Sequence, residues 1–240
     1  MAKLLCFGSG SSGNSYAIRC ENETLLIELG LPWKDIIKGL DYDIKNVVGC
    51  LVSHEHSDHL NKDTIKKVVQ YSIPTYSCES VAHKYKGISI IKKGAKTQIG
   101  GFKIQPIPLQ HSVECFGFVI EHDDFGKMVF ASDCSEFLYR IKNVNHWLIE
   151  ANWSEDVLID NMCNNAEMRS RHEQHLEIND TIEALKLNVN MNTQTIVLLH
   201  LSNGNSNAKK FIKQVSNELS FSNVHVADKG LIVELLKNDF

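Results

Sequence analysis

The chain has 240 residues, of which 43% are hydrophobic and 22% charged, and its formal net charge is −4 at pH 7. This length is enough for one large domain or two small ones, and the composition is that of an ordinary globular protein. The mild negative charge argues against a protein that coats nucleic acid non-specifically, although a local basic groove stays compatible with it. We find no run of membrane-spanning length and expect no secretory signal region.

The seven cysteines are scattered along the chain, at positions 6, 20, 50, 78, 115, 134 and 163. No two of them form a Cys-x-x-Cys pair, so their spacing indicates neither a thiolate zinc site nor a disulfide framework. We therefore expect a cytoplasmic protein.

The first elements surround a glycine- and serine-rich run at 8–15. Residues 3–7 are typical of a strand, and 16–20 and 24–28 of two paired strands. The run between them lacks the lysine and the spacing of a P-loop, which argues against a nucleotide site. We expect a tight loop whose backbone N–H groups approach a phosphate or a metal site.

Further elements follow with regular spacing. We expect helices at 31–40 and 61–71, the first opened by Pro32, and a strand at 47–52. More strands are predicted at 74–78, 88–91, 102–108, 116–122, 127–131, 195–199, 224–227 and 231–235, and more helices at 157–162, 178–187 and 208–219. No internal linker or repeat interrupts them, so we predict two sheets with helices outside, as a single domain over 1–240.

The densest group of metal-type side chains directly follows the strand at 47–52. Three histidines and two carboxylates fall within six positions, 54–59. In an extended segment His54 and His56 share a face and can bind one ion together, while the turning chain presents Asp58 and His59 to a second ion. Such ligands suit zinc, manganese or iron. The alternative is a histidine-rich surface turn.

Two metal sites need ligands from elsewhere in the chain. His111, Asp133 and His200 each follow an apolar strand-like run, where functional groups tend to be displayed. Taken singly, each is more often an ordinary surface residue. Taken with the cluster at 54–59, they form the set that a two-metal hydrolase requires.

This ordered set of motifs resembles the metallo-β-lactamase superfamily, over nearly the whole chain. More closely it resembles the YycJ (WalJ) branch of bacterial and phage proteins, described as DNA exonucleases. The matching pieces are residues 8–15, 25–30, 150–152, 175–176 and 200–202. The resemblance implies an α/β (α+β) fold, a four-layer αββα sandwich with metals at one edge between the sheets.

The resemblance also implies a role for each ligand. The first metal is assigned His54, His56 and His111; the second is assigned Asp58, His59 and His200; Asp133 bridges both. Two positions depart from the family pattern. Glu28 stands where an aspartate is usual, which lengthens a supporting carboxylate, and Trp153 stands where relatives often carry a polar residue.

The expected catalytic groups are Asp58 and His175. Asp58 can orient the attacking water and accept its proton, while His175 can protonate the leaving group. The alternative for His175 is a solvated, charged helix start. The predicted substrate contacts are Ser11, Asn14, Arg169, Arg171 and Ser202.

The preferred function is a metal-dependent phosphodiesterase or nuclease acting on nucleic acid, with a DNA exonuclease first among these. The cofactors are two divalent ions, zinc or manganese, and no membrane partner is expected. Two alternatives remain open: hydrolysis of a small phosphodiester or thioester by the same centre, and a non-catalytic metal-binding regulator. A basic rim of lysines and arginines could hold phosphates, or could be an ordinary solvated surface.

Overall fold

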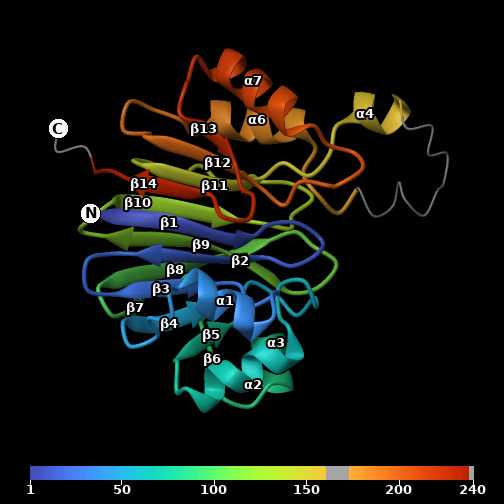
Figure 1. Ribbon diagram of the computed structural model, residues 1–240. Helices are drawn as coiled ribbons and strands as arrows, with labels where there is room; N and C mark the ends of the chain where they lie inside the picture. The colour runs from blue at the N-terminus through green and yellow to red at the C-terminus, as the bar shows by residue number, and fades with distance from the viewer. Residues whose placement is uncertain (161–172, 238–240) are drawn as a thin grey trace.

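Two β-sheets packed face to face form the centre of the protein, and helices cover their outer faces (Figure 1). This computed structural model describes residues 1–160 and 173–237. Each sheet has seven strands. The four-layer αββα sandwich predicted from the sequence is therefore confirmed.

The first sheet has the strand order β14-β1-β2-β3-β4-β5-β6. Its strands are β1 (Ala2–Gly8), β2 (Ser15–Arg19), β3 (Thr24–Ile27), β4 (Val47–Leu51), β5 (Thr75–Ser77), β6 (Ile88–Ile90) and β14 (Ile232–Leu235). The strands from β14 to β3 pair antiparallel, and those from β3 to β6 pair parallel. The parallel half brings the ends of β3 and β4 to one edge.

The second sheet has the order β13-β12-β11-β10-β9-β8-β7. Its strands are β7 (Thr97–Ile99), β8 (Phe102–Leu109), β9 (Cys115–His122), β10 (Gly126–Ala131), β11 (His146–Glu150), β12 (Thr195–Leu199) and β13 (Val224–Val226). Here too an antiparallel half, β7 to β10, continues into a parallel half, β10 to β13. The carboxyl ends of β10, β11 and β12 consequently meet at a common edge, where open α/β sheets usually carry ligands.

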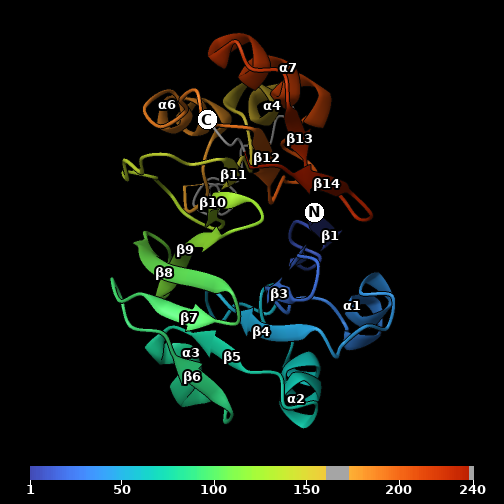
Figure 2. The same ribbon diagram turned by 90° about the vertical axis from the view of Figure 1, so that its left-hand side faces the viewer.

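Helices lie on both outer faces (Figures 1 and 2). On the side of the first sheet are α1 (Trp33–Gly39), α2 (Lys62–Gln70) and α3 (Glu79–Lys84); on the side of the second are α4 (Glu155–Asp160), α6 (Ile178–Lys186) and α7 (Ala208–Leu219). The Asn61 side chain caps α2 by accepting hydrogen bonds from the N–H groups of Asp63 and Thr64. Within the described residues, no helix combines the length and apolarity needed to cross a membrane.

The central strands of the second sheet, β10 to β12, are largely buried on both faces, because alternate side chains enter different cores. In β10, Met128 and Phe130 pack into the core between the sheets, whereas Val129 and Ala131 pack under the helices. Trp147 of β11 is fully buried in the helix-side core. These two cores hold the strand ends rigidly, which suits a site that needs fixed geometry.

Most elements lie within two residues of the predicted ranges, and β12 matches its range completely. Three described elements were not predicted, namely α3, β7 and β11. The helix predicted at 157–162 begins earlier, at Glu155, and its predicted end lies outside the described residues. The omission of β11 matters most, because this strand ends in Glu150 at the edge that carries the site.

Candidate metal centre

All seven predicted ligands meet at the edge where the parallel strands of both sheets end. His54, His56, Asp58 and His59 lie in the connection between β4 and α2. His111 follows β8, Asp133 follows β10, and His200 follows β12. They form two groups that share Asp133: a first ligand set of His54, His56 and His111, and a second of Asp58, His59 and His200.

In the first ligand set, three ring nitrogens converge. His56 Nδ1 lies 3.0 Å from His54 Nε2 and 3.2 Å from His111 Nε2. Ligands about 2.0–2.1 Å from a tetrahedral ion are separated by roughly 3.3 Å, so this spacing fits one ion. Hydrogen bonds cannot satisfy three lone pairs that face one another, whereas a shared cation can. The residues present therefore fit a divalent metal.

The second ligand set combines two histidines with one carboxylate. Asp58 Oδ2 lies 3.4 Å from His200 Nε2 and 3.5 Å from His59 Nε2. The Asp58 side chain is 24% exposed, whereas that of His59 is fully buried. Asp58 is thus the carboxylate of this set that solvent or substrate can reach.

Asp133 lies between the two sets, with one carboxylate oxygen toward each. Its Oδ2 is 3.7 Å from His54 Nε2 and 3.8 Å from His111 Nε2, both in the first set. Its Oδ1 is 3.2 Å from His59 Nε2 in the second set, and 3.2 Å from His200 Nδ1. This is the arrangement expected of a bridging carboxylate.

The protonation of this site follows from its crowded charges. Burial, together with His59 nearby, lowers the pKa of His54 well below its usual value, which leaves it in the neutral form that binds metals. Burial lowers the pKa of His200 as well, but Asp133 and the hydrogen bond with Asp58 more than offset this and raise it to about 10. Burial raises the pKa of Asp133, but His200 and His59 more than offset this and hold it well below its usual range. Protonated histidine thus balances carboxylate charge that divalent ions would otherwise balance.

Two fully buried glutamates support the histidines from behind. Glu28, just after β3, accepts a hydrogen bond from Ser53 N at 3.3 Å through Oε2, and its Oε1 lies 3.4 Å from His59 Nδ1. A carboxylate behind a ligand histidine fixes the ring orientation and raises its basicity. The longer glutamate at this position, where the family pattern has aspartate, still reaches the histidine.

Glu150 has the corresponding place at the end of β11. Its Oε2 accepts a hydrogen bond from Cys134 N at 2.8 Å, while its Oε1 lies 2.7 Å from His175 Nδ1 and 3.1 Å from His200 Nδ1. Asn152 adds a hydrogen bond from Nδ2 to the carbonyl of His200 at 2.7 Å. No role was predicted for Glu150 or Asn152, although the motif at 150–152 was a signal for them.

Strained backbone marks the same positions. Glu28, Asp133 and His200 adopt positive φ values of 65°, 56° and 53°, in the left-handed region that residues other than glycine rarely adopt. Each follows a strand by one or two residues, so the sharp turn directs its side chain into the site. Such strain persists where the surrounding structure holds it, and it concentrates at functional sites.

The glycine- and serine-rich loop contacts the second ligand set, so it approaches the candidate metal centre as predicted. Asn14 N donates to the carbonyl of Asp58 at 2.7 Å, and Asn14 Nδ2 lies 2.9 Å from His59 Nε2. Ser9 Oγ accepts a hydrogen bond from His200 N at 2.9 Å. Asn14 was predicted to contact substrate, but its side chain is fully buried. In this position Asn14 holds Asp58 and His59 in place.

The other predicted residues lie around the centre. Ser11 is exposed in the turn of this loop, and Ser202 is partly exposed just after His200. The His175 side chain is 19% exposed, and its ring centroid lies 5.2 Å from that of His200 and 5.7 Å from that of His111. Trp153 Nε1 donates to the carbonyl of His175 at 3.1 Å. Arg169 and Arg171 lie outside the described residues.

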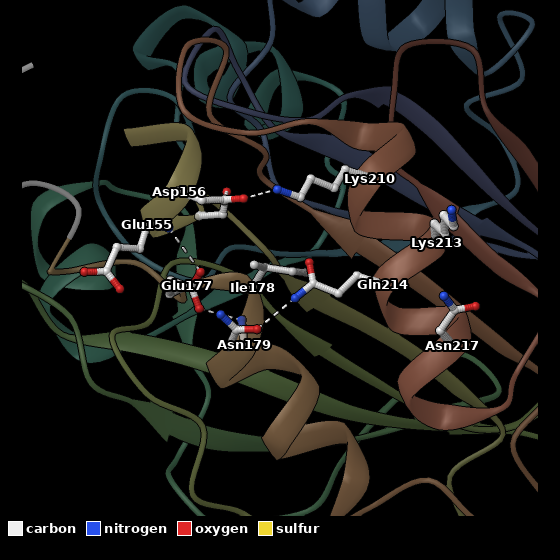
Figure 3. A pocket seen from close by; sticks show the side chains of 10 residues that line it. Glu155, Asp156, Glu177, Ile178, Asn179, Lys210, Lys213, Gln214 and Asn217 are labelled. Carbon is white, nitrogen blue, oxygen red and sulfur yellow. Dashed lines mark hydrogen bonds and ion pairs between the residues drawn. The ribbon is translucent and has the colours of Figure 1, made fainter. Parts of the chain in front are cut away.

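A pocket of about 680 Å³ opens between α4, α6 and α7 (Figure 3). Its lining includes Ser154 and Glu177, which lie two residues after Asn152 and His175. Lys210 forms an ion pair with Asp156 across it. Figure 3 draws no interaction for Lys213, and the acidic Glu155, Asp156 and Glu177 line the same space. The pocket is therefore mixed in charge, and it does not form the basic rim considered from the sequence.

Fold and site together define a metallo-β-lactamase-type hydrolase. Residues 34–201 match the family model described as the beta-lactamase superfamily domain. The chain belongs to this superfamily of metal-dependent hydrolases.

Three particular proteins are similar to it. Exodeoxyribonuclease WalJ of Streptococcus pneumoniae is 24% identical over 257 residues, covering 97% of this chain and 91% of that protein. Exodeoxyribonuclease YycJ of Bacillus anthracis is 26% identical over 166 residues, or 62% of each chain. The crystal structure of YhfI from Bacillus subtilis, a metallo-beta-lactamase fold protein, superposes with a TM-score of 0.74 at 16% identity over 97% of this chain and 98% of that one. The resemblance to the YycJ and WalJ proteins is thus confirmed.

Proposed function

We propose that this protein hydrolyses phosphodiester bonds in nucleic acid with two divalent ions, zinc or manganese, and that it degrades DNA from an end. The observation that carries the proposal is the position of Asp133, whose two oxygens face the two ligand sets. The names of the WalJ and YycJ relatives support DNA as the substrate and an exonucleolytic mode.

The first ligand set with Asp133 would hold one ion, and the second set with Asp133 the other. Two ions in such a site supply an activated water near neutral pH and neutralise charge on a phosphate during in-line attack. The contribution of the chain is the fixed spacing of the ligands, which the buried Glu28 and Glu150 maintain.

Asp58 is the proton acceptor in this proposal. Its side chain is 24% exposed, whereas that of the bridging candidate Asp133 is 3% exposed. It therefore lies where an attacking water can reach it. Its Oδ2 is oriented by His59 and His200, so the other carboxylate oxygen can take the proton.

His175 is the proton donor to the leaving oxygen. Glu150 holds its Nδ1 at 2.7 Å, and its Nε2 forms no hydrogen bond with any described residue. The ring lies beside both ligand sets without belonging to either. A histidine held in this way keeps one nitrogen free for the reaction while the other fixes its orientation.

We also propose the cytoplasm as its compartment, where DNA is accessible. The six cysteines in the described part of the chain are free thiols, and all are buried. Free thiols in this number suit a reducing compartment.

The test is a cleavage assay on DNA labelled at one end, single- and double-stranded, after chelation and after adding back manganese or zinc. We expect cleavage only with added metal, with labelled mononucleotides released first from the preferred end. Asp133→Ala should abolish it. His83→Ala is the matched control, because His83 is 68% exposed on α3 and belongs to neither ligand set.

Other results would contradict the proposal in distinct ways. Internal fragments without mononucleotides, from substrates labelled at either end in separate reactions, would indicate an endonuclease. Hydrolysis of bis-p-nitrophenyl phosphate or a thioester, but of no DNA, would indicate a small-molecule hydrolase. Metal-loaded protein that cleaves nothing would indicate a metal-binding regulator.

A further inference from the structure

A second group of metal-type side chains lies at the edge of the sandwich opposite the centre. Cys20 directly follows the end of β2, whereas the first residue of β2, Ser15, donates a hydrogen bond to the carbonyl of Glu28 at the centre. His122 ends β9, whereas the first residue of β9, Cys115, lies near His54. Each strand therefore spans the sheet from the centre to this second group.

Cys20, His122 and Asp124 bring three different metal-binding groups together. Their ligand atoms, a thiol sulfur, a ring nitrogen and a carboxylate oxygen, all lie within 4.8 Å of one another. Cys20 Sγ is 3.5 Å from His122 Nδ1. Cys20 comes from the first sheet and the other two residues from the second, so the group joins the two sheets.

The His122 ring is oriented as metal-binding histidines usually are. Its Nε2 lies 3.1 Å from Glu23 Oε1, and Glu23 Oε2 accepts a hydrogen bond from Gly101 N at 2.8 Å. A histidine ligand commonly donates its other ring N–H to a carboxylate, which fixes the tautomer. The carboxylate on Nε2 thus leaves the Nδ1 lone pair directed toward Cys20 and Asp124.

The packing around His122 maintains this orientation. The ring centroid lies 4.6 Å from that of Phe102 and 5.7 Å from that of Phe125. A side chain at Gly101 would meet His122 Nε2 at 2.7 Å, so the glycine leaves room for the ring. His122 Nδ1 also accepts a hydrogen bond from Asp124 N at 3.1 Å, which a bound ion would replace.

Charge and access favour a cation at this position. Among the described residues, neither Glu23 nor Asp124 forms an ion pair with a lysine or arginine. Asp124 is exposed, so an ion can reach the group from solvent. One thiolate, one imidazole and one carboxylate form a donor set that suits zinc, with water as the fourth ligand.

We propose that Cys20, His122 and Asp124 bind a zinc ion that links the two sheets at the edge opposite the catalytic centre. The ion would hold the turn after β2 to the turn after β9. The competing explanation is a hydrogen bond between a thiol and an imidazole without metal.

Cobalt(II) separates these two explanations, because cobalt bound to a thiolate gives a near-ultraviolet charge-transfer band. The ligand sets of the catalytic centre contain no sulfur, so cobalt bound only there gives no such band. We expect the band in the full-length protein loaded with cobalt, and its loss in Cys20→Ser. Cys6→Ser should keep it, since Cys6 is a buried thiol in β1 outside this group.

Two further measurements complete the test. Asp124→Ala, at an exposed position, should fold and should weaken cobalt binding at this site by at least about tenfold. The zinc content of the zinc-loaded protein, measured by elemental analysis, should be lower by one ion per chain in Cys20→Ser. A protein that takes up cobalt without the band, or a band that survives in Cys20→Ser, would overturn the proposal.

Discussion

Asp133 Oδ2 faces the first ligand set and Asp133 Oδ1 faces the second, so both proposed metal sites share one side chain. We expect Asp133→Ala to empty both sites and abolish hydrolysis, because uncompensated positive charge remains when a shared carboxylate is lost. His200→Ala removes a ligand of the second set only and should leave the first ion bound. Elemental analysis after gel filtration measures the number of metal ions bound per chain in each variant, with His83→Ala as the control. Asp133→Ala with full occupancy and wild-type turnover would exclude the bridging role.

His175 lies beside both ligand sets without belonging to either, and its Nδ1 is held by Glu150. His175→Ala should keep the fold and both ions while turnover on DNA falls by about a hundredfold, as is typical for loss of a general acid. The loss should be smaller on a p-nitrophenyl ester of thymidine phosphate, whose leaving group needs no proton. Steady-state kinetics on both substrates decide the matter. Equal losses would indicate that His175 positions the substrate. No loss of turnover on either substrate would show that His175 takes no part in the reaction.

The sequence singled out the candidate ligands more readily than the groups that support them. His111, Asp133 and His200 each follow an apolar strand, so local pattern and family resemblance were enough to find them. Glu150 meets its partners His175 and His200 across separations of 25 and 50 residues, which no local pattern reveals. Asn14 was recognised by its motif, but only its burial indicates that it supports ligands.

At the scale of elements, the segment that follows β3 packs closely against the backbone of Asp58 at Gly30. A side chain on Gly30 would overlap the carbonyl oxygen of Asp58 and approach Asn14 N. Gly30→Ala should therefore destabilise the protein by about 1–3 kcal/mol, as overpacking does, and weaken the second metal site. Urea unfolding and metal content measure the two effects. Gly204→Ala is the control, since a side chain there meets nothing within 4 Å, and equal stability of the two variants would contradict this account.

The strand β11 contains a histidine that makes stability depend on pH. His146 is fully buried, and its burial lowers its pKa from 6.5 to about 4. The unfolded chain takes up this proton below pH 6.5 and the folded chain does not, so stability is full above pH 6.5 and falls as the pH drops toward 4. The loss amounts to about 3 kcal/mol at 1.36 kcal/mol per pKa unit.

Denaturant unfolding between pH 4 and pH 8 isolates this contribution when wild type is compared with His146→Gln. The variant should lose less stability on acidification, while His83→Gln should follow the wild type. Parallel curves for wild type and His146→Gln would show that His146 does not contribute to the pH dependence.

Element prediction succeeded where the apolar pattern was clear and failed where polar residues interrupted it. β12 is an uninterrupted apolar run that ends before His200, and it was predicted completely. Four of the six residues of α3 are polar, and β7 has Thr97 and Gln98 among its three residues, so neither segment has a clear apolar pattern. β11 carries His146 at its start and Glu150 at its end, so its apolar core of three residues did not stand out.

At the scale of the molecule, the candidate metal centre lies at one edge of the two sheets. The smaller group of Cys20, His122 and Asp124 lies at the opposite edge. Both sheets change from antiparallel to parallel pairing, and this change brings the ends of β3, β4, β10, β11 and β12 together. The layer order followed from the family resemblance, because strand patterns alone do not specify how two sheets pack. The group around His122 was not predictable, since its members come from different sheets and only the fold brings them together.

The most direct measurement of the central claim is anomalous diffraction from crystals grown with zinc or manganese. We predict two anomalous peaks at the edge formed by the ends of β4 and β10. One should lie about 2 Å from the facing ring nitrogens of His54, His56 and His111, the other at similar distances from His59 and His200, and Asp133 should contact both. A single peak, or two peaks of which only one contacts Asp133, would contradict a centre built on a shared carboxylate.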